Sequence, residues 1–194
     1  MFIETFNTSI AVLVVLAQVI AALLLYFVIF YKRFKDTAVV AFLENQSLRL
    51  ITLVSFVGIA GSLTYSNIIG FEPCVMCWWQ RIFQYPVFII SFLALALKET
   101  SNRFAAYVVT LSTIGLGFSV YHYLVQMVDS VTSSCDVFGQ TASCAGYYVF
   151  EFGYITIPMM ALTIFVNTIL LSFFYYKKSP KMNYTQSPEI KTLA

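Results

Sequence analysis

Two cysteines, an arginine and several aromatic residues lie together in the segment FEPCVMCWWQRIFQYP, at residues 71–86. Cys74 and Cys77 form a Cys-x-x-Cys pair, a spacing that recurs where disulfides are made and broken. Pro73 suits the first turn of a helix, and a helix that starts there places both cysteines at its positive end, which favours thiolate over thiol. Arg81 follows Cys77 by one helical turn, so it shares a helical face with that cysteine and adds a fixed positive charge.

The other two cysteines, Cys135 and Cys144, lie in the segment CDVFGQTASC. The plainest interpretation is that two inert disulfides staple two short loops. This interpretation is well supported for Cys135 and Cys144 and less well for Cys74 and Cys77. A zinc site is a further alternative, because Cys-x-x-Cys often supplies half of one. Its second half would be another closely spaced Cys or His pair, and the wider Cys135–Cys144 spacing with no nearby histidine does not fit. We therefore rank zinc well below redox chemistry and predict no metal.

The composition indicates a membrane protein. Hydrophobic residues make up 60% of the 194 residues and charged residues 10%, whereas a soluble domain is about 45–50% apolar and about 25% charged. The length suits one small domain. A net charge of +2 argues against a nucleic-acid partner.

Runs of roughly 17–25 mostly apolar residues are long enough to cross a bilayer as helices. The sequence contains five such runs, at about 8–31, 47–70, 80–97, 104–127 and 153–176. The residues before the first run hold no Lys or Arg, and the run is longer than the core of a secretory signal. We therefore predict an all-α integral membrane protein in which the first helix is retained.

The basic residues predict the orientation of these helices. All of the eleven Lys and Arg residues except Arg81 fall on one side if the five helices alternate. Cytoplasmic loops are enriched in Lys and Arg, so we expect the N-terminus outside and the C-terminus inside. All four cysteines then lie outside the cytoplasm, where disulfides persist. Arg81 is the one cation that departs from this bias.

The segment PCVMCWWQRIFQYP resembles the signature of the DsbB/BdbC disulfide bond formation proteins: Cys-x-x-Cys, two aromatic or apolar residues, Gln or Glu, Arg, and then Tyr-Pro. A second similarity lies in FGYITIPMMALT, which looks like the start of the family's last helix. The resemblance covers roughly residues 47–176. It implies an antiparallel four-helix transmembrane bundle, to which this chain adds one N-terminal transmembrane helix.

The resemblance also implies a function. The family oxidises a soluble thioredoxin-fold thiol oxidase of the DsbA type and passes the electrons to a membrane quinone, which is ubiquinone or menaquinone. The expected location is the lipid bilayer of the bacterial cytoplasmic (inner) membrane. Carried over to this sequence, Cys74 and Cys77 become the quinone-coupled pair, with Cys77 facing the quinone. Arg81 would stabilise that thiolate and a developing negative charge on a quinone oxygen, and Gln80 would make a quinone or structural contact.

The same resemblance assigns roles to the second pair. Cys135 would be attacked by the partner's nucleophilic cysteine, and Cys144 would then be released to exchange with Cys74. The redox-active disulfides are thus Cys74–Cys77 and Cys135–Cys144. Two features stay open. His122 is either a packed, hydrogen-bonded core histidine or a quinone contact. The aromatic residues Trp78, Trp79 and Tyr85 fit either an interfacial belt or the flat wall of a site for a planar ligand.

The chain divides into three parts on this interpretation. Residues 1–46 hold the extra helix and a cytoplasmic link, 47–176 form the four-helix redox domain, and 177–194 form a polar, disordered cytoplasmic tail. The role of the extra helix is open, and Gln18 could face another helix or a second protein.

Two other functions compete with the thiol oxidase. A VKOR-like protein also couples cysteines to quinone, but its Cys-x-x-Cys lies on a different helix in the chain order and lacks the following Gln-Arg. A small membrane scaffold with two structural disulfides would need no chemistry at all. Trapping of free thiols separates the scaffold from the two redox proteins.

Overall fold

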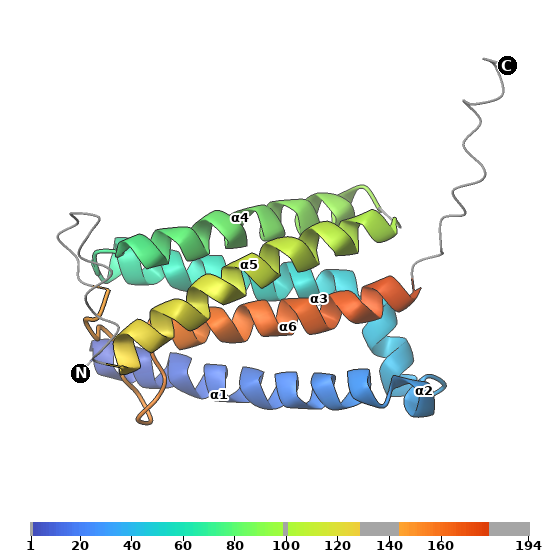
Figure 1. Cartoon of the computed structure of the whole chain (residues 1–194), viewed down its shortest axis with the longest axis horizontal. Coiled ribbons are helices and arrows are strands. Elements are labelled where there is room, and N and C mark those ends of the chain that lie inside the picture. Colours follow the sequence, from blue (N-terminus) through green and yellow to red (C-terminus); the bar gives the residue numbers. More distant parts are fainter. Residues whose placement is uncertain (1, 99–100, 129–143, 179–194) are drawn as a thin grey trace, which may run out of the picture.

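The computed structural model describes residues 2–98, 101–128 and 144–178, and these residues are mainly helical (Figure 1). The elements are α1 (Phe2–Ile29), α2 (Tyr31–Phe34), α3 (Ala38–Leu63), a π-helical turn η1 (Thr64–Ile68), α4 (Val75–Ala96), α5 (Asn102–Met127) and α6 (Ile157–Lys178). In the described part of the chain, β-structure is limited to an isolated bridge between Glu151 and Ile155. The predicted all-α class is confirmed.

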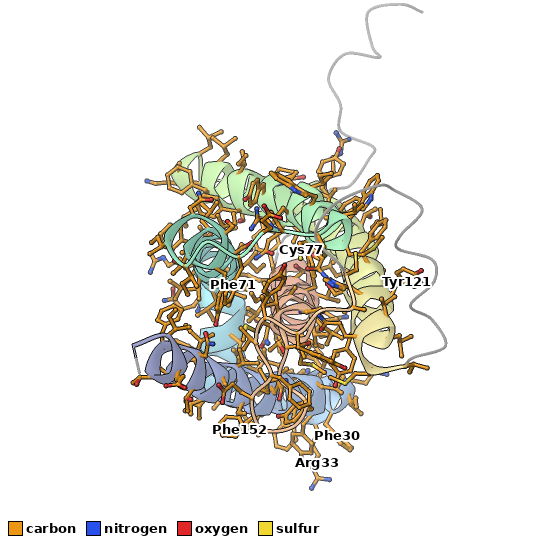
Figure 2. The ribbon with its side chains drawn as sticks, turned by 90° about the vertical axis from the view of Figure 1, so that its left-hand side faces the viewer. Phe30, Arg33, Phe71, Cys77, Tyr121 and Phe152 are labelled. Carbon is orange, nitrogen blue, oxygen red and sulfur yellow. The ribbon has the colours of Figure 1, made fainter. Side chains whose placement is uncertain are left out.

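Helices α3, α4, α5 and α6 form an antiparallel bundle. α3 packs against α4 and α6, and α5 packs against the same two helices from the other side, as the end-on view shows (Figure 2). α1 lies outside this bundle along α6 (Figure 1). The predicted plan of four bundled helices and one extra N-terminal helix is confirmed.

The chain turns place the two cysteine-bearing connections at one end of the bundle. The connection 69–74 before α4 and the described connection 144–156 before α6 both lie at the end where the chain begins (Figure 1). α2 and the C-terminal end of α6 lie at the opposite end (Figure 1). Residues 179–194, most of the predicted tail, lie outside the described residues, and α6 itself continues to Lys178.

Four helices begin earlier than the hydropathy runs predicted, α5 by only two residues. α1 begins at Phe2 rather than at position 8, α3 at Ala38 rather than at 47, and α4 at Val75 rather than at 80. For α3 the reason is a cap: the side chain of Thr37 accepts a hydrogen bond from the backbone N–H of Val40. Polar residues that end an apolar run do not end the helix, because backbone hydrogen bonds and caps decide where it stops.

α6 begins later than predicted, at Ile157 rather than at 153. Gly153 has a φ of 76°, a left-handed conformation that interrupts a helix. Pro158 occupies the first turn of α6, where its missing N–H leaves no helical hydrogen bond unmade.

Four of the helical segments in the described residues are long and apolar enough to cross a membrane: Ile3–Ile29, Ala38–Ile68, Arg103–Met127 and Ile157–Lys178. α4 has a similar length, with 22 residues, but it is more polar because it carries Gln80, Arg81 and Gln84, all of them buried. Its polar side chains point into the bundle. The chain is therefore a multi-pass membrane protein in which the bundle buries Gln80, Arg81 and Gln84 of α4.

A glycine sets the close approach of α5 to α6. A Cβ atom added to Gly115 would lie 2.4 Å from the Cζ atom of Phe165, whose side chain is 1% exposed. Small residues at helix contacts in membranes allow such close packing. Gly117 lies two residues further along α5 and faces open space. A Cβ there would meet no heavy atom of the described chain within 4 Å.

We therefore expect Gly115→Ala to destabilise the protein by about 1–3 kcal/mol, because the ring of Phe165 cannot move without opening the α5–α6 contact. Gly117→Ala is the matched control and should leave stability unchanged or slightly increased. Thermal unfolding of both variants in detergent, followed by tryptophan fluorescence, measures the difference. Equal midpoints for the two variants would contradict this account of the contact.

Candidate functional site

The Cys-x-x-Cys pair lies at the beginning of α4. Cys74 is the residue that caps the helix, and its carbonyl accepts the first helical hydrogen bond, from Trp78 N at 3.2 Å. The Sγ atoms of Cys74 and Cys77 lie 3.2 Å apart, within hydrogen-bond distance of each other. Both sulfurs thus sit at the positive end of the helix, as the sequence predicted.

His122 of α5 lies directly beside this pair. Its Nε2 atom is 3.6 Å from Cys74 Sγ and 3.2 Å from the carbonyl oxygen of Cys144. Its Nδ1 atom is 3.3 Å from Gln80 Nε2. The ring is buried and hydrogen-bonded, but its partners are the residues of the predicted site. The linear sequence gave no sign of this, because Cys74 and His122 meet only through the packing of α4 on α5.

The same proximity bears on the zinc alternative. One donor atom from each of Cys74, Cys77 and His122 lies within 4.8 Å of the others, so the three residues could hold a metal ion. In the sequence, no histidine lies near Cys135 and Cys144, which speaks against zinc; in three dimensions His122 lies beside Cys74 and the carbonyl oxygen of Cys144. Three donors are nonetheless one fewer than the four of a structural zinc site.

Cys144 joins the first pair in one apolar cluster. It is buried, and it belongs with Cys74, Met76 and Val125 to a cluster between α4, α5 and the connection to α6. The structure therefore places Cys144 in the same cluster as Cys74, the residue with which the resemblance implies that it exchanges. Cys135 lies outside the described residues.

The residues after Cys144 are held against the bundle. Gln126 Nε2 donates a hydrogen bond to the carbonyl of Gly146 at 3.1 Å, and the hydroxyl of Tyr147 donates to the carbonyl of Gln126. The ring of Tyr148 stacks on Phe71, with centroids 4.9 Å apart. These contacts fix the connection 144–156 over the end of the bundle where Cys77 and Phe71 lie (Figure 2).

Arg81 is a buried cation held by neutral groups. Its side chain is 7% exposed. Nε donates to the hydroxyl of Ser62 at 2.9 Å, and Nη2 donates to the carbonyl of the same residue at 3.0 Å. The guanidinium carbon lies 5.2 Å from the centroid of the Trp78 ring. A charge buried among neutral partners is costly, which favours a functional reason for it.

A cavity of about 190 Å³ opens beside Cys77 and Arg81, between α1, α3, α4 and α6. It is several times larger than the roughly 30 Å³ that a water molecule occupies in the liquid. Most of its walls are apolar, and Ser62 and Gln80 add polar groups to it. Trp78 and Trp79 are not among its lining residues, so in the described structure they do not form the wall of this cavity.

Gln84 is a residue of this site that the sequence reasoning missed. It lines the cavity one turn beyond Arg81. Its Nε2 atom is buried and has no hydrogen-bond partner in the described part of the chain. Gly58 of α3 makes room for it, because a Cβ there would lie 1.9 Å from that nitrogen. The spacing of Cys77, Arg81 and Gln84 along one helical face was the available signal.

The sequence model of the family described as "Disulfide bond formation protein DsbB" matches residues 44–175. The probable disulfide formation protein C of Bacillus cereus is 38% identical over 136 residues, which cover 69% of this chain and 96% of that protein. The SPbeta prophage-derived disulfide bond formation protein B of Bacillus subtilis is 40% identical over 137 residues, 71% of this chain and 90% of that protein. No solved structure matches the chain.

The two thiols at the start of α4 differ in their electrostatic setting. The hydrogen bond with Cys77 and, secondly, burial raise the pKa of Cys74 to about 12, although the hydrogen bond with His122 acts in the opposite direction. Cys74 is 2% exposed, whereas Cys77 is partly exposed to the cavity. The raised pKa favours the protonated thiol at Cys74 in the reduced pair.

We expect alkylation of the reduced protein by iodoacetamide to modify Cys77 before Cys74. Because only the thiolate reacts and the pKa of Cys74 lies near 12, labelling of Cys74 should rise about tenfold per pH unit between pH 8 and 11 without a plateau. In Cys77→Ala the main cause of the raised pKa is gone, so the profile of Cys74 should shift to lower pH. Tandem mass spectrometry locates the label. An unchanged profile in Cys77→Ala would contradict the assigned hydrogen bond.

Proposed function

Because the chain belongs to the family of the disulfide bond formation protein DsbB, we propose that it reoxidises a soluble thioredoxin-fold oxidase of the DsbA type and passes the electrons to a membrane quinone. Membership in this family carries a role in disulfide bond formation at a membrane. The observation that carries the finer proposal is the position of Cys77: its sulfur lies between a disulfide-exchange site and an apolar cavity within the bundle.

The residues around the cavity fit a quinone. A quinone has a flat apolar ring with two carbonyl oxygens, and it accepts two electrons and two protons. The apolar walls suit the ring, and the guanidinium of Arg81 and the partnerless amide of Gln84 suit oxygens that accept hydrogen bonds. Ubiquinone and menaquinone both meet this description.

The first half of the proposed reaction is disulfide exchange at the outer end of the bundle. A thiolate of the partner attacks Cys135 in the Cys135–Cys144 disulfide, which forms a mixed disulfide and releases Cys144 as a thiolate. The partner's second thiol then attacks the mixed disulfide. The partner leaves with a disulfide, and both Cys135 and Cys144 are reduced.

The second half transfers this reduction to the first pair. Cys144 attacks Cys74 in the Cys74–Cys77 disulfide, and Cys77 leaves as a thiolate. Cys135 then attacks Cys144, which restores the Cys135–Cys144 disulfide and leaves Cys74 reduced. The shared cluster of Cys74 and Cys144 supports this step, because the two residues are already neighbours. Arg81, on the same face as Cys77, stabilises the negative charge released there.

His122 is proposed to manage the proton of Cys74. Cys74 gains a proton when its disulfide is reduced and loses one when the disulfide forms again. The imidazole lies within reach of its sulfur, and Gln80 orients the ring from the other side. This role places His122 on the exchange side of α4 and differs from the quinone contact that the resemblance implies.

The proposed orientation places the cysteine connections outside the cytoplasm of a bacterial cell. α2 carries Lys32 and Arg33, and α6 ends with Lys177 and Lys178, at the end of the bundle opposite to the cysteines (Figure 1). The positive-inside rule then assigns that end to the cytoplasm. The N-terminus and both cysteine pairs face the oxidising side, where a soluble partner can reach them.

Quinone reduction tests the proposal directly. Purified full-length protein, decylubiquinone and a reduced thioredoxin-fold oxidase should together bleach the quinone absorbance. Cys77→Ser should abolish the reaction, and Arg81→His should raise the KM for quinone by about tenfold, since it removes hydrogen bonds from a charged donor. Unchanged turnover in Cys77→Ser would overturn the assigned roles. If both cysteine pairs stay oxidised when reduced partner is added, the chain is a scaffold with structural disulfides.

A second prediction tests the cavity as the quinone site. Gly61 lines the cavity, and a Cβ added there would meet no described heavy atom within 4 Å, so Gly61→Leu should fill the space without a clash. We expect the KM for decylubiquinone to rise by about tenfold or more. Gly117→Leu, which also faces open space but lies on α5 away from the cavity, is the matched control. Equal KM values in the two variants would exclude the cavity as the site.

A further inference from the structure

α1 lies outside the part of the chain that defines the family. The family match covers residues 44–175, whereas α1 spans Phe2–Ile29. The relative from Bacillus cereus is 96% covered by 69% of this chain. The first helix is therefore an element of this chain that the matched four-helix unit does not require.

Polar contacts dock α1 at a fixed position on the bundle. The hydroxyl of Tyr65 donates to Asn7 Oδ1 at 3.2 Å near the outer end. At mid-helix, the hydroxyl of Tyr154 donates to Gln18 Oε1 at 2.8 Å, and Gln18 Nε2 lies 3.4 Å from the hydroxyl of Thr163 on α6. Gln18 thus faces another helix of the same chain. Hydrogen bonds of this kind set the register of helices in a membrane.

The backbone on the same face of α1 also accepts a hydrogen bond from the bundle. Asn167 of α6 donates from Nδ2 to the carbonyl of Ala17 at 3.2 Å. Ala11 is fully buried against the bundle. Leu16, Ile20 and Leu23 point the other way and are each more than half exposed, as suits a surface that faces lipid. One face of α1 is therefore packed and the other meets the acyl chains.

In this position α1 forms one wall of the cavity beside Cys77. Four of its residues line the cavity, Ile10, Leu13, Val14 and Ala17, and they do so together with Gly61 of α3 and Arg81 of α4. Without these side chains the space next to the guanidinium and to Cys77 would be open along α1. The helix thus separates the dithiol and its cation from the lipid.

We propose that α1 is the outer wall of the quinone site and contacts the bound quinone, so that its side chains decide which quinones the protein accepts. The inference rests on the proposed quinone function. Arg81 and Gln84 of α4 bind the quinone oxygens. Leu13 and Ala17 of α1 pack on the ring substituents or the first part of the prenyl tail. The small side chain of Ala17 leaves room for that group.

Photolabelling of the unaltered protein tests this contact. The probe is a benzoquinone that carries an azide and a decyl tail, and an excess of decylubiquinone serves as competitor. We expect competed label in the tryptic peptide that ends at Lys32 and contains α1, as well as in the peptide that contains Cys77. Competed label on the Cys77 peptide without label on α1 would overturn the role of α1 and leave the quinone function standing.

A pair of variants in the full-length chain gives a second readout. Ala17→Phe places a ring in the cavity and should raise the KM for decylubiquinone about tenfold while kcat changes less. Ala22→Phe adds the same ring to an exposed position of α1 that does not line the cavity, and should leave both constants unchanged. Equal KM values in the two variants overturn the inference. If the unaltered protein shows no turnover and no competed label, the quinone function and this inference are both overturned.

Discussion

The burial of one positive charge governs the arrangement of the bundle. Arg81 lies inside a helix that runs among apolar helices, where an unpaired ion is costly. Ser62 offsets part of that cost with its hydroxyl and its carbonyl. Ser62 stands just before the π-helical turn η1, an irregularity that frequently occurs at functional sites. The contact between α3 and α4 thus includes the side chain of Arg81, whose charge is not required for packing.

The two faces of α4 carry different chemistry. Toward α5, Cys74 meets His122 and the connection that begins at Cys144, and Gln80 reaches His122 while also lining the cavity. Toward α1 and α3, Cys77 and Arg81 border the cavity, which the connections 69–74 and 144–156 also line at the outer end. A single helix therefore separates a surface suited to exchange with another protein from a space suited to an apolar acceptor. The Cys-x-x-Cys spacing fits this division, because it lets two neighbouring sulfurs face two environments.

The sequence predicted the parts of this structure that local patterns control. Hydropathy runs identified the five helices, and the spacing of Cys77 and Arg81 placed them on one helical face, as the structure confirms. The end of each helix was less predictable, because caps such as Thr37 and the left-handed Gly153 decide it. The approach of His122 to Cys74 depends on how α5 packs against α4, which no periodicity encodes. Gln84 was missed because its significance lies in a hydrogen bond that the described residues do not make.

The extra helix also changes where the two ends of the chain emerge. Four antiparallel helices return both termini to the same face of a membrane, whereas the addition of α1 sends them to opposite faces (Figure 1). The start of α1 lies next to the connection 144–156, where Thr8 contacts Glu151 at 3.4 Å. A segment joined ahead of α1 would lie beside the connection 144–156 and the end of the bundle that carries Cys74 and Cys77. A segment joined after α6 would lie on the opposite side of the membrane, away from the cysteines.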